Sequence, residues 1–423
     1  MLVRSVIAML MVTVLPPQLF AQSNRIDLVR PDAPAMTAFG DYAIGVRTLH
    51  FTDPDRPDIV NTVSGAATVR YDRTLTVELW YPATLSAGQE PGGQYVTSTR
   101  NTAISATLTG RAVRNAEPVA GQQRFPLVII SHGYPGNRYL LSHLGENLAS
   151  KGYIVASIDH LESTYTDQQE IASTLYHRAP DQRFVLDQVA RLGEDPGSFL
   201  YQTVAADRTA VVGYSMGGYG LINNLGAAYS PAIVDLPIAP PNRLLAVQSA
   251  LNPDFRDHLD ARIRAGVAIA PWGMNNGVWR PVDLRGIRLP TLYVSGSVDT
   301  TAGYANGTRE IFELAANSDR YLLTFVNAGH SAGAPIPVPV ELLTSGDGTG
   351  VGHYTDPVWD TLRMNNIMDH FIAAFLDLNL KGLEDRRRFL ELPENSEDGW
   401  TGFEQGAAIG LKLEHLAPAE RLP

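Results

Sequence analysis

The chain has 423 residues, of which 44% are hydrophobic, and a formal net charge of -11 at pH 7. This acidic balance argues against nucleic acid and anionic lipid surfaces as partners. The sequence contains no cysteine, which excludes a disulfide framework, thiol chemistry and a thiolate metal site.

The first 21 residues have the three-part form of a secretory signal. A basic Arg4 precedes the apolar run at 6–15, and Ala21 is followed by polar sequence. The apolar run is shorter than the ~20 residues that a membrane span requires, which makes a retained anchor the weaker alternative. We therefore expect a signal peptide at 1–21, a secreted or periplasmic mature chain from Gln22 onward, and no membrane span in it.

Antiparallel strands are expected at the start of the mature chain. Residues 42–46 and 74–82 alternate or run apolar between turn-forming residues, and the Asp- and Pro-rich segment 53–58 is interpreted as a turn between them. Residues 83–124 are rich in Gly, Ser, Thr and Gln, which is typical of a surface insertion.

A parallel sheet is predicted from residue 125 onward. The continuous apolar run 125–131 suits a strand that is buried on both faces. The segment 138–151 has the apolar spacing of a helix, 153–160 is interpreted as a second buried strand, and 163–192 is helical in pattern. This alternation of strand and helix predicts the α/β class, with right-handed crossover connections.

The sequence Gly-Tyr-Ser-Met-Gly at 213–217 follows the apolar run 209–212 and precedes helical sequence. This context is typical of a nucleophile elbow, in which a serine lies in a strained turn between a strand and a helix. The alternative is an ordinary loop that contains a serine. We therefore take Ser215 as the candidate nucleophile.

Two later strands end in residues that suit a serine nucleophile. The apolar segment beginning at 289 ends at Asp299, and the segment beginning at 321 ends at His330. The order Ser, Asp, His is that of an α/β-hydrolase triad, in which the imidazole accepts the serine proton and the carboxylate orients the imidazole. His353 and Asp283 are the competing candidates for base and acid.

Stabilisation of an oxyanion requires two backbone donors. The amide after the serine belongs to Met216, and Tyr134 follows the strand 125–131, so these two residues are the expected donors. His132 is interpreted as a residue that hydrogen-bonds within its loop. Asp159, His160 and Glu162 form a polar cluster nearby, and we expect a hydrogen-bonded loop there rather than a metal site.

Insertions and strand ends are the expected source of specificity. Residues 227–265 contain several prolines and form either a cap over the site or a surface excursion. Trp272 and Met274 follow the apolar strand 267–270, where they line an acyl pocket or belong to the core. Tyr134 is a third candidate for substrate binding.

The end of the chain begins with a Pro- and Gly-rich loop at 333–356 and an amphipathic helix at 357–380. After residue 390, we recognise no periodic spacing of apolar residues that would indicate a helix or a strand. The expected organisation is a signal peptide at 1–21, one α/β-hydrolase domain at 22–390 with insertions at about 83–124, 227–265 and 333–356, and a C-terminal tail at 391–423.

The chain resembles α/β-hydrolases of the dienelactone-hydrolase and platelet-activating-factor-acetylhydrolase type, which include secreted cutinase-like polyester hydrolases. The motifs that carry the resemblance are Leu-Trp-Tyr-Pro-Ala at 79–83, Ile-Ser-His-Gly-Tyr at 130–134, the elbow at 213–217, Val-Asp at 298–299 and Ala-Gly-His at 328–330. The resemblance covers roughly residues 40 to 380. It implies a mostly parallel sheet with helices on both faces.

The resemblance also implies a triad of Ser215, Asp299 and His330 and an oxyanion hole formed by the amides of Tyr134 and Met216. We therefore expect a serine carboxylesterase that acts on small-molecule or polymeric esters through an acyl-serine and needs neither a cofactor nor a metal. The alternatives are a serine peptidase of the prolyl-oligopeptidase type and a catalytically silent binding protein on the same fold. The sequence leaves acyl length, alcohol group and oligomeric state open.

Overall fold

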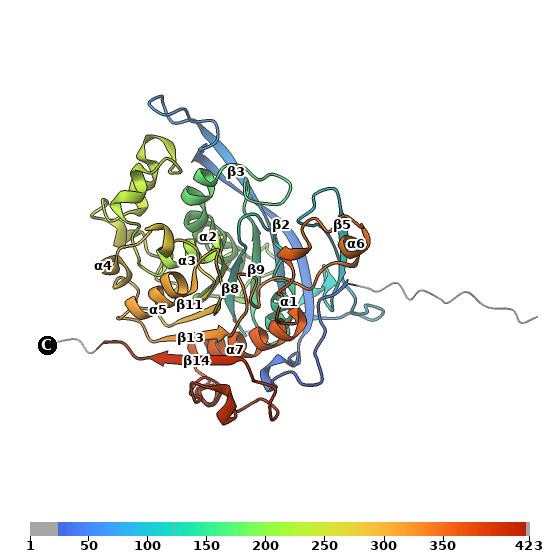
Figure 1. Cartoon of the computed structure of the whole chain (residues 1–423). Helices are drawn as coiled ribbons and strands as arrows, with labels where there is room; N and C mark the ends of the chain where they lie inside the picture. Colours follow the sequence, from blue (N-terminus) through green and yellow to red (C-terminus); the bar gives the residue numbers. More distant parts are fainter. Residues whose placement is uncertain (1–23, 122, 420–423) are drawn as a thin grey trace, which may run out of the picture.

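The computed structural model describes residues 24–121 and 123–419, so the expected signal peptide lies outside the described residues. A central sheet runs through this part of the chain (Figure 1). Its strands are β2 (Ala43–Pro57), β3 (Arg70–Thr84), β6 (Val113–Arg114), β7 (Glu117–Pro118), β8 (Phe125–Ser131), β9 (Ile154–Asp159), β10 (Val204–Tyr214), β11 (Ile263–Ile269), β12 (Thr291–Gly296), β13 (Arg320–Phe325) and β14 (Leu411–Leu416). The strand order is β14-β13-β12-β11-β10-β8-β9-β3-β2-β6, with β7 paired to β3.

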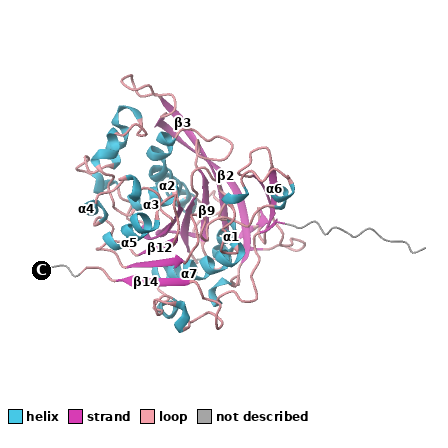
Figure 2. Ribbon diagram, viewed as in Figure 1, coloured by secondary structure: helices cyan, strands magenta, loops and turns pink. Residues whose placement is uncertain are grey.

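The six strands from β9 to β13 in this order pair in parallel, whereas β3 and β14 join them antiparallel. Helices cover both faces of the sheet (Figure 2). The α-helices are α1 (Ser142–Ser150), α2 (Ile171–Glu194), α3 (Met216–Asn224), α4 (Pro281–Leu284), α5 (Arg309–Leu314), α6 (Val340–Thr344) and α7 (Thr361–Lys381). Helices α1 and α7 contribute to one hydrophobic core, and α2, α3 and α5 contribute to the other.

Strand β8 shows why a continuous apolar run suits the middle of this sheet. Val128 and Ile130 belong to the core beneath α1 and α7, while Leu127 and Ile129 belong to the core beneath α2 and α3. All residues of the strand are buried. Because successive side chains point to opposite faces, a strand covered on both sides needs apolar residues at every position. The predicted strand at 125–131 is therefore confirmed with the same bounds.

The prediction of a turn at 53–58 is wrong. Strand β2 continues to Pro57 and remains paired with β3, and the turn lies between 57 and 70. A bulge between Asp53 and Arg56 absorbs the Asp-Pro-Asp sequence, and Asp55 adopts a φ of 58° there. A bulge accommodates residues that a regular ladder excludes. The hairpin of β2 and β3 extends beyond the rest of the sheet (Figure 1).

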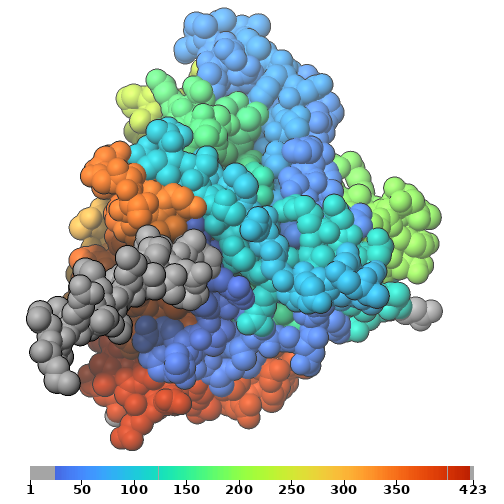
Figure 3. All heavy atoms as spheres, turned by 90° about the vertical axis from the view of Figure 1, so that its right-hand side faces the viewer, coloured from blue at the N-terminus to red at the C-terminus, as the bar shows by residue number. Residues whose placement is uncertain are grey.

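A second, smaller sheet of order β1-β5-β4 takes two of its three strands from residues 83–124, which also contain β6 and β7. Its strands are β1 (Asn24–Arg25), β4 (Gln94–Ser98) and β5 (Ser105–Thr109). The segment near residue 100 lies beside the segment near residue 347 on the face shown in Figure 3, where Asn101 Nδ2 donates to Asp347 Oδ2 at 2.9 Å. Two of the expected insertions thus contact each other.

The remaining elements are short helices of the 3₁₀ type, apart from η6, which is a π-helix. They are η1 (Ala35–Thr37), η2 (Pro231–Asp235), η3 (Pro241–Gln248), η4 (Phe255–His258), η5 (Met274–Asn276), η6 (Tyr304–Thr308), η7 (Val351–His353), η8 (Glu384–Phe389) and η9 (Ser396–Asp398). The short helices η2 to η4 make up much of the expected cap. Asn242 Oδ1 in this segment accepts the amide of Gly65 at 2.8 Å, and Gln248 Nε2 donates to Tyr176 O at 2.9 Å. These contacts tie the segment to the hairpin end and to α2.

The C-terminal helix begins and ends at residues that suit its termini. Asp360 accepts the amide of Arg363 at 2.8 Å as the N-cap, and Gly382 has a φ of 68° at the C-cap. Both features are typical of helix termini. The predicted helix at 357–380 is therefore confirmed as α7, whereas the helical pattern at 163–192 forms α2 only from Ile171 onward.

The sequence analysis assigned no element after residue 390, but β14 pairs antiparallel with β13 and forms the edge of the main sheet. Leu411 and Leu413 of this strand are buried and alternate with more exposed Lys412 and Glu414. Residues 411–416 thus belong to the sheet rather than to a separate tail. In residues 24–121 and 123–419, no helix combines the length and apolarity needed to cross a bilayer.

Candidate active site

Ser215 lies in the sharp connection between β10 and α3, at the carboxyl edge of the parallel strands. Its backbone has φ 53° and ψ -113°, a strained conformation for a residue with a side chain. The serine amide donates to Ile269 O at 2.9 Å, and Trp272 N donates to Ser215 O at 3.1 Å. The neighbouring strand β11 and the segment after it therefore hold the strained residue in place.

The glycines around Ser215 are required because backbone approaches them closely. A Cβ on Gly213 would lie 2.3 Å from Gly217 O, and one on Gly217 would lie 1.9 Å from Ser131 O. A Cβ on Gly133 would lie 3.2 Å from Ser215 Cβ. The turn is therefore packed directly against the loop that follows β8.

His330, which the sequence analysis selected together with Ser215 and Asp299, lies within hydrogen-bonding distance of both of them. His330 Nε2 lies 3.0 Å from Ser215 Oγ, and His330 Nδ1 lies 2.9 Å from Asp299 Oδ2. The second carboxylate oxygen, Oδ1, accepts the amides of Thr301 at 2.8 Å and Ala302 at 3.1 Å. Asp299 is thereby fixed with one oxygen directed at the imidazole.

This arrangement can activate a hydroxyl group. A carboxylate that accepts from Nδ1–H leaves Nε2 as the acceptor for the serine proton. The ring of His330 packs against the ring of Tyr214 with centroids 5.3 Å apart. The side chain of His330 is 19% exposed, whereas that of Asp299 is fully buried. The pair thus faces solvent through the imidazole only.

Asp356 supports the loop that carries His330, and the sequence analysis missed it. Its Oδ2 accepts the amide of Gly329 at 2.7 Å, and its Oδ1 accepts the amides of Val358 and Trp359. A carboxylate that accepts several amides fixes the backbone around it. The Asp-Pro-Val-Trp sequence at 356–359 is a turn signal, but only the folded structure brings it to Gly329.

The two expected oxyanion donors are the amides of Tyr134 and Met216. In the described part of the chain, neither amide donates to a backbone or side-chain acceptor. Met216 is the first residue of α3, where amides have no partner within the helix. Gly133, which precedes Tyr134, faces Ser215. Both N–H groups can therefore donate to a new acceptor.

His132 and the cluster at 159–162 form a buried hydrogen-bonded network. His132 Nδ1 donates to Gly133 O at 2.7 Å, and its Nε2 accepts the amide of His160 at 3.2 Å. His160 in turn contacts Ser131 Oγ at 2.8 Å and Asp181 Oδ2 at 3.0 Å. Burial lowers the pKa of His132 well below its ordinary value and that of His160 to about 3. Both rings are therefore neutral at pH 7.

The competing candidates have other partners. His353 Nε2 lies 2.7 Å from Tyr165 Oη, and burial together with Arg100 lowers its pKa to about 4. Asp283 binds Arg280, with which it caps the short helix α4. Neither His353 nor Asp283 contacts Ser215, so the geometry favours His330 and Asp299.

The expected substrate-binding residues differ in burial. Trp272 is half-buried beside Ser215, and its ring packs edge-on against Tyr219 with centroids 6.1 Å apart. Tyr219 stacks in turn on Tyr229 at 4.7 Å. Met274 is almost completely buried within the core. Trp272 thus packs against an aromatic stack while the residue remains partly accessible.

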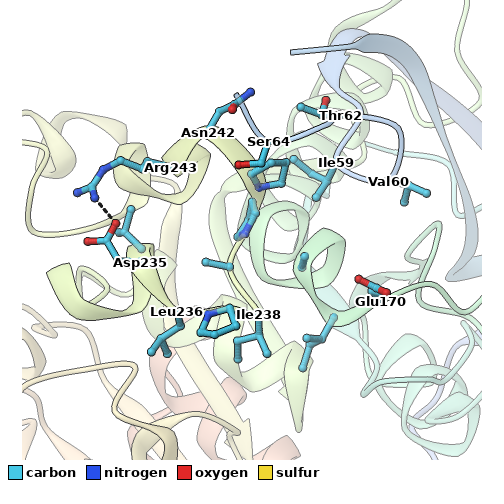
Figure 4. A pocket seen from close by; sticks show the side chains of 17 residues that line it. Ile59, Val60, Thr62, Ser64, Glu170, Asp235, Leu236, Ile238, Asn242 and Arg243 are labelled. Carbon is cyan, nitrogen blue, oxygen red and sulfur yellow. Dashed lines mark hydrogen bonds and ion pairs between the residues drawn. The ribbon is translucent and has the colours of Figure 1, made fainter. Parts of the chain in front are cut away.

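A cavity of about 810 Å³ lies between the hairpin end, the start of α2 and the 231–243 segment. Ile59, Thr62 and Ser64 line one side of it, and Leu236 and Ile238 line the other (Figure 4). Neither Ser215 nor its two partners line this cavity. Among the described residues, no group of three or more His, Cys, Asp or Glu residues has an arrangement that could hold a metal ion.

Comparison with known proteins places the chain near ester-hydrolysing enzymes. A family model described as PET hydrolase-like matches residues 83–250. Cutinase est1 of Thermobifida alba is 28% identical over 206 residues, which are 48% of this chain and 53% of that protein. Cutinase cut1 of Thermobifida fusca is also 28% identical over 206 residues, which are 48% of this chain and 49% of that protein. The chain therefore spans about half the length of the curated relatives it matches.

A solved structure extends the similarity to most of the chain. The ferulic acid esterase from Streptomyces cinnamoneus is 25% identical with a TM-score of 0.56, and the match covers 81% of this chain and 91% of that one. The fold prediction is confirmed: this is an α/β-hydrolase fold with a mostly parallel sheet and helices on both faces. The resemblance to cutinase-like α/β esterases is confirmed as well.

Proposed function

We propose that this chain, which has the α/β-hydrolase fold and resembles cutinase-like esterases, is a serine hydrolase of carboxylic esters. The observation that carries the proposal is the connection of Ser215 Oγ through His330 to Asp299, at 3.0 and 2.9 Å, on a strained elbow. The matching relatives are named cutinase, the matching family model is described as PET hydrolase-like, and the similar solved structure is a ferulic acid esterase. All of these names refer to ester hydrolysis.

In the first half of the proposed reaction, Ser215 Oγ attacks the ester carbonyl carbon while His330 Nε2 accepts the hydroxyl proton. The carbonyl oxygen becomes an oxyanion that accepts from the amides of Tyr134 and Met216. As the C–O bond breaks, the imidazolium returns the proton to the leaving alcohol. The products of this half are the free alcohol and an acyl-serine.

In the second half, water attacks the acyl-serine and His330 accepts a proton from the water. The same two amides accept the negative charge again, and collapse of the intermediate releases the carboxylic acid and restores the Ser215 hydroxyl. Asp299 remains ionised and stabilises the transient imidazolium. The reaction consumes one water and requires no organic cofactor.

Specificity is proposed to come from the surroundings of the serine. The accessible part of Trp272 suits contact with an apolar or aromatic portion of a small-molecule or polymeric ester. Tyr134, Met274, the insertion at 227–265 as a cap, and the loop at 333–356 are the further proposed determinants. We propose a secreted or periplasmic location because of the signal-like sequence at 1–21.

The direct test compares p-nitrophenyl esters with aminoacyl-anilides as substrates of the purified chain. We expect turnover of the esters that is lost in Ser215→Ala and retained in Ser86→Ala, a matched change at an exposed loop serine. Preferred turnover of the anilides would instead indicate a peptidase. Failure to hydrolyse any ester and to react with an organophosphonate would indicate a silent binding protein.

A further inference from the structure

Arg178 of α2 contacts the loop that carries the proposed oxyanion donor, although it lies far from Tyr134 in the sequence. Its side chain is almost completely buried. Nη1 donates to His132 O at 2.9 Å, Nη2 donates to Gly133 O at 3.3 Å, and Nη2 also donates to Ser163 Oγ. One guanidinium group therefore holds two successive carbonyls of the loop.

These contacts determine the direction of the Tyr134 amide. The peptide bond between Gly133 and Tyr134 is trans, since the cis bond recorded nearby is the next one, between Tyr134 and Pro135. In a trans peptide, the C=O and N–H groups point in opposite directions. Because Gly133 O accepts from Arg178 and from His132 Nδ1 at 2.7 Å, the Tyr134 N–H points away from Arg178.

The loop also packs against the nucleophile. A Cβ on Gly133 would lie 3.2 Å from Ser215 Cβ, which shows how closely the loop approaches the elbow. Tyr134 Oη also donates to Gln169 O, which fixes the ring beyond the amide. The Tyr134 amide thus lies between the anchored Gly133 carbonyl and the anchored Tyr134 ring. Its N–H has no acceptor among the described residues.

The burial of Arg178 is costly. Desolvation lowers the pKa of its guanidinium to about 9, and its Nε has no acceptor among the described residues. Asp181 carries a compensating charge, but its oxygens bind Arg73 at 3.0 Å, Arg56 at 3.3 Å and His160. The bonds that offset the cost directly are those to the two loop carbonyls and to Ser163, because a buried charge requires hydrogen-bonding partners.

Room for this side chain is provided by Gly220 of α3. A Cβ at that position would lie 2.7 Å from Arg178 Cγ. The close approach of α2 to α3 therefore places the guanidinium between the elbow helix and the loop after β8. The same helix pair that supports Ser215 also reaches the second oxyanion donor through Arg178.

We infer that Arg178 is a positioning residue for the oxyanion hole: it orients the Tyr134 amide and so contributes to the chemical step rather than to substrate binding. This inference rests on the proposed esterase function. Misplacement of a donor by an ångström costs up to about 100-fold in rate, and loss of one donor costs about 100- to 1,000-fold. Truncation of Arg178 is therefore expected to lower kcat with little change in KM.

The test uses Arg178→Met, Arg178→Lys and the control Arg183→Met. Arg183 lies on the same helix and binds Asn224 rather than the loop. Active sites are counted by an organophosphonate so that rates refer to folded, reactive molecules. We expect kcat for an activated ester to fall about 10- to 100-fold in Arg178→Met, to recover partly in Arg178→Lys, and to remain unchanged in Arg183→Met.

A second readout separates positioning from general stability. Amide donors stabilise an oxyanion better than the corresponding thiolate-like anion, so the ratio of oxoester to thionoester turnover measures the contribution of the hole. We expect this ratio to fall in Arg178→Met and not in the control. An unchanged ratio or an unchanged kcat per active site in an active enzyme would overturn the inference. A wild-type chain that hydrolyses no ester would overturn the proposed function itself, and this inference with it.

Discussion

Two hydrogen-bonded arrays in this molecule have the same residue types in the same order of contact. Ser215, His330 and Asp299 form the first, with distances of 3.0 and 2.9 Å. Ser131, His160 and Asp181 form the second, with distances of 2.8 and 3.0 Å. By distance alone, the second array is as good a triad as the first.

The surroundings of the two arrays differ. Ser131 ends the strand β8, pairs with Gly213 on one side and Ile158 on the other, and is completely buried. Ser215 has a φ of 53°, lies beside two amides without acceptors in the described residues, and its partner imidazole is partly exposed. The comparison shows that a nucleophile requires access for the substrate and donors for the oxyanion in addition to hydrogen-bonding distances.

The serine substitutions are expected to give the largest effect. Ser215→Ala should lower kcat/KM for an activated ester by about 10⁴- to 10⁶-fold, because the acceptor of the acyl group is lost. Ser131→Ala should keep kcat within about tenfold of the wild type but lower the free energy of unfolding by about 1–3 kcal/mol, because His160 Nε2 loses its partner. Steady-state kinetics and urea unfolding measure the two effects. Equal losses of activity in both variants would contradict the assignment of a catalytic role to Ser215 and a structural role to Ser131.

Substitution of the aspartate in each array should distinguish the two arrays a second time. Asp299→Asn is expected to lower kcat by about 10⁴-fold by disturbing the tautomer of His330. Asp181→Asn is expected to lower the free energy of unfolding by about 3–5 kcal/mol, because it removes the closer of the two carboxylates that pair with the buried Arg73 and leaves only Glu162, at 3.3 Å. A stable Asp181→Asn variant, measured by denaturant unfolding, would contradict the structural role of the second array.

Gly217 lies where the two arrays meet, since a Cβ on it would lie 1.9 Å from Ser131 O. Gly217→Ala is therefore expected to lower the free energy of unfolding by about 3 kcal/mol through overpacking against backbone. Gly352→Ala is the matched control, because no atom lies within 4 Å of its added Cβ, and a change within about 0.5 kcal/mol is expected. Similar unfolding midpoints for the two variants would contradict the close contact.

Lowering the pH should destabilise the protein gradually through its buried histidines, with a smaller effect than the substitutions above. The pKa of His160 is lowered to about 3 and that of His353 to about 4, both chiefly by burial, whereas an unfolded histidine titrates near ~6.5. Between these values the unfolded chain binds more protons, so stability is fully present above pH ~6.5 and decreases as the pH falls. The charged groups that face them include Asp181 and Arg178 for His160 and Arg100 for His353.

His353→Gln tests this dependence against the exposed control His50→Gln. Without His353, unfolding takes up one proton fewer. The slope of the free energy of unfolding against pH therefore decreases by up to about 1.4 kcal/mol per pH unit. Urea unfolding between pH 4.5 and 7 should therefore give a shallower pH dependence for His353→Gln and an unchanged one for His50→Gln. Parallel curves for all three proteins would show that His353 is not buried in its neutral form.

The sequence predicted those elements that a local pattern of apolar residues or glycines indicates. The apolar run at 125–131 indicated a doubly covered strand, and the elbow glycines indicated Ser215 because a turn of that kind excludes side chains. Asp299 and His330 followed from their places at strand ends. Strand β14 carried a signal that was missed, since Leu411 and Leu413 alternate with Lys412 and Glu414.

Other features depend on tertiary contacts and leave no local pattern. The polar residues Arg178 and Asp181 have the sequence pattern of a solvated helix face, but both are buried. Arg178 packs against the loop after β8, and Asp181 binds Arg73 and His160. The bulge in β2 was hidden because Asp-Pro-Asp usually marks a turn. Asp356 becomes a support for His330 only when its loop folds back to Gly329.

The most direct test of the central claim is the site of covalent modification by a fluorophosphonate. Peptide mapping by mass spectrometry after labelling of the folded chain identifies the reactive serine. The account predicts one adduct, on Ser215, with none on Ser131, and loss of ester hydrolysis in proportion to labelling. An adduct on a different serine, or full hydrolysis with Ser215 unlabelled, would contradict it.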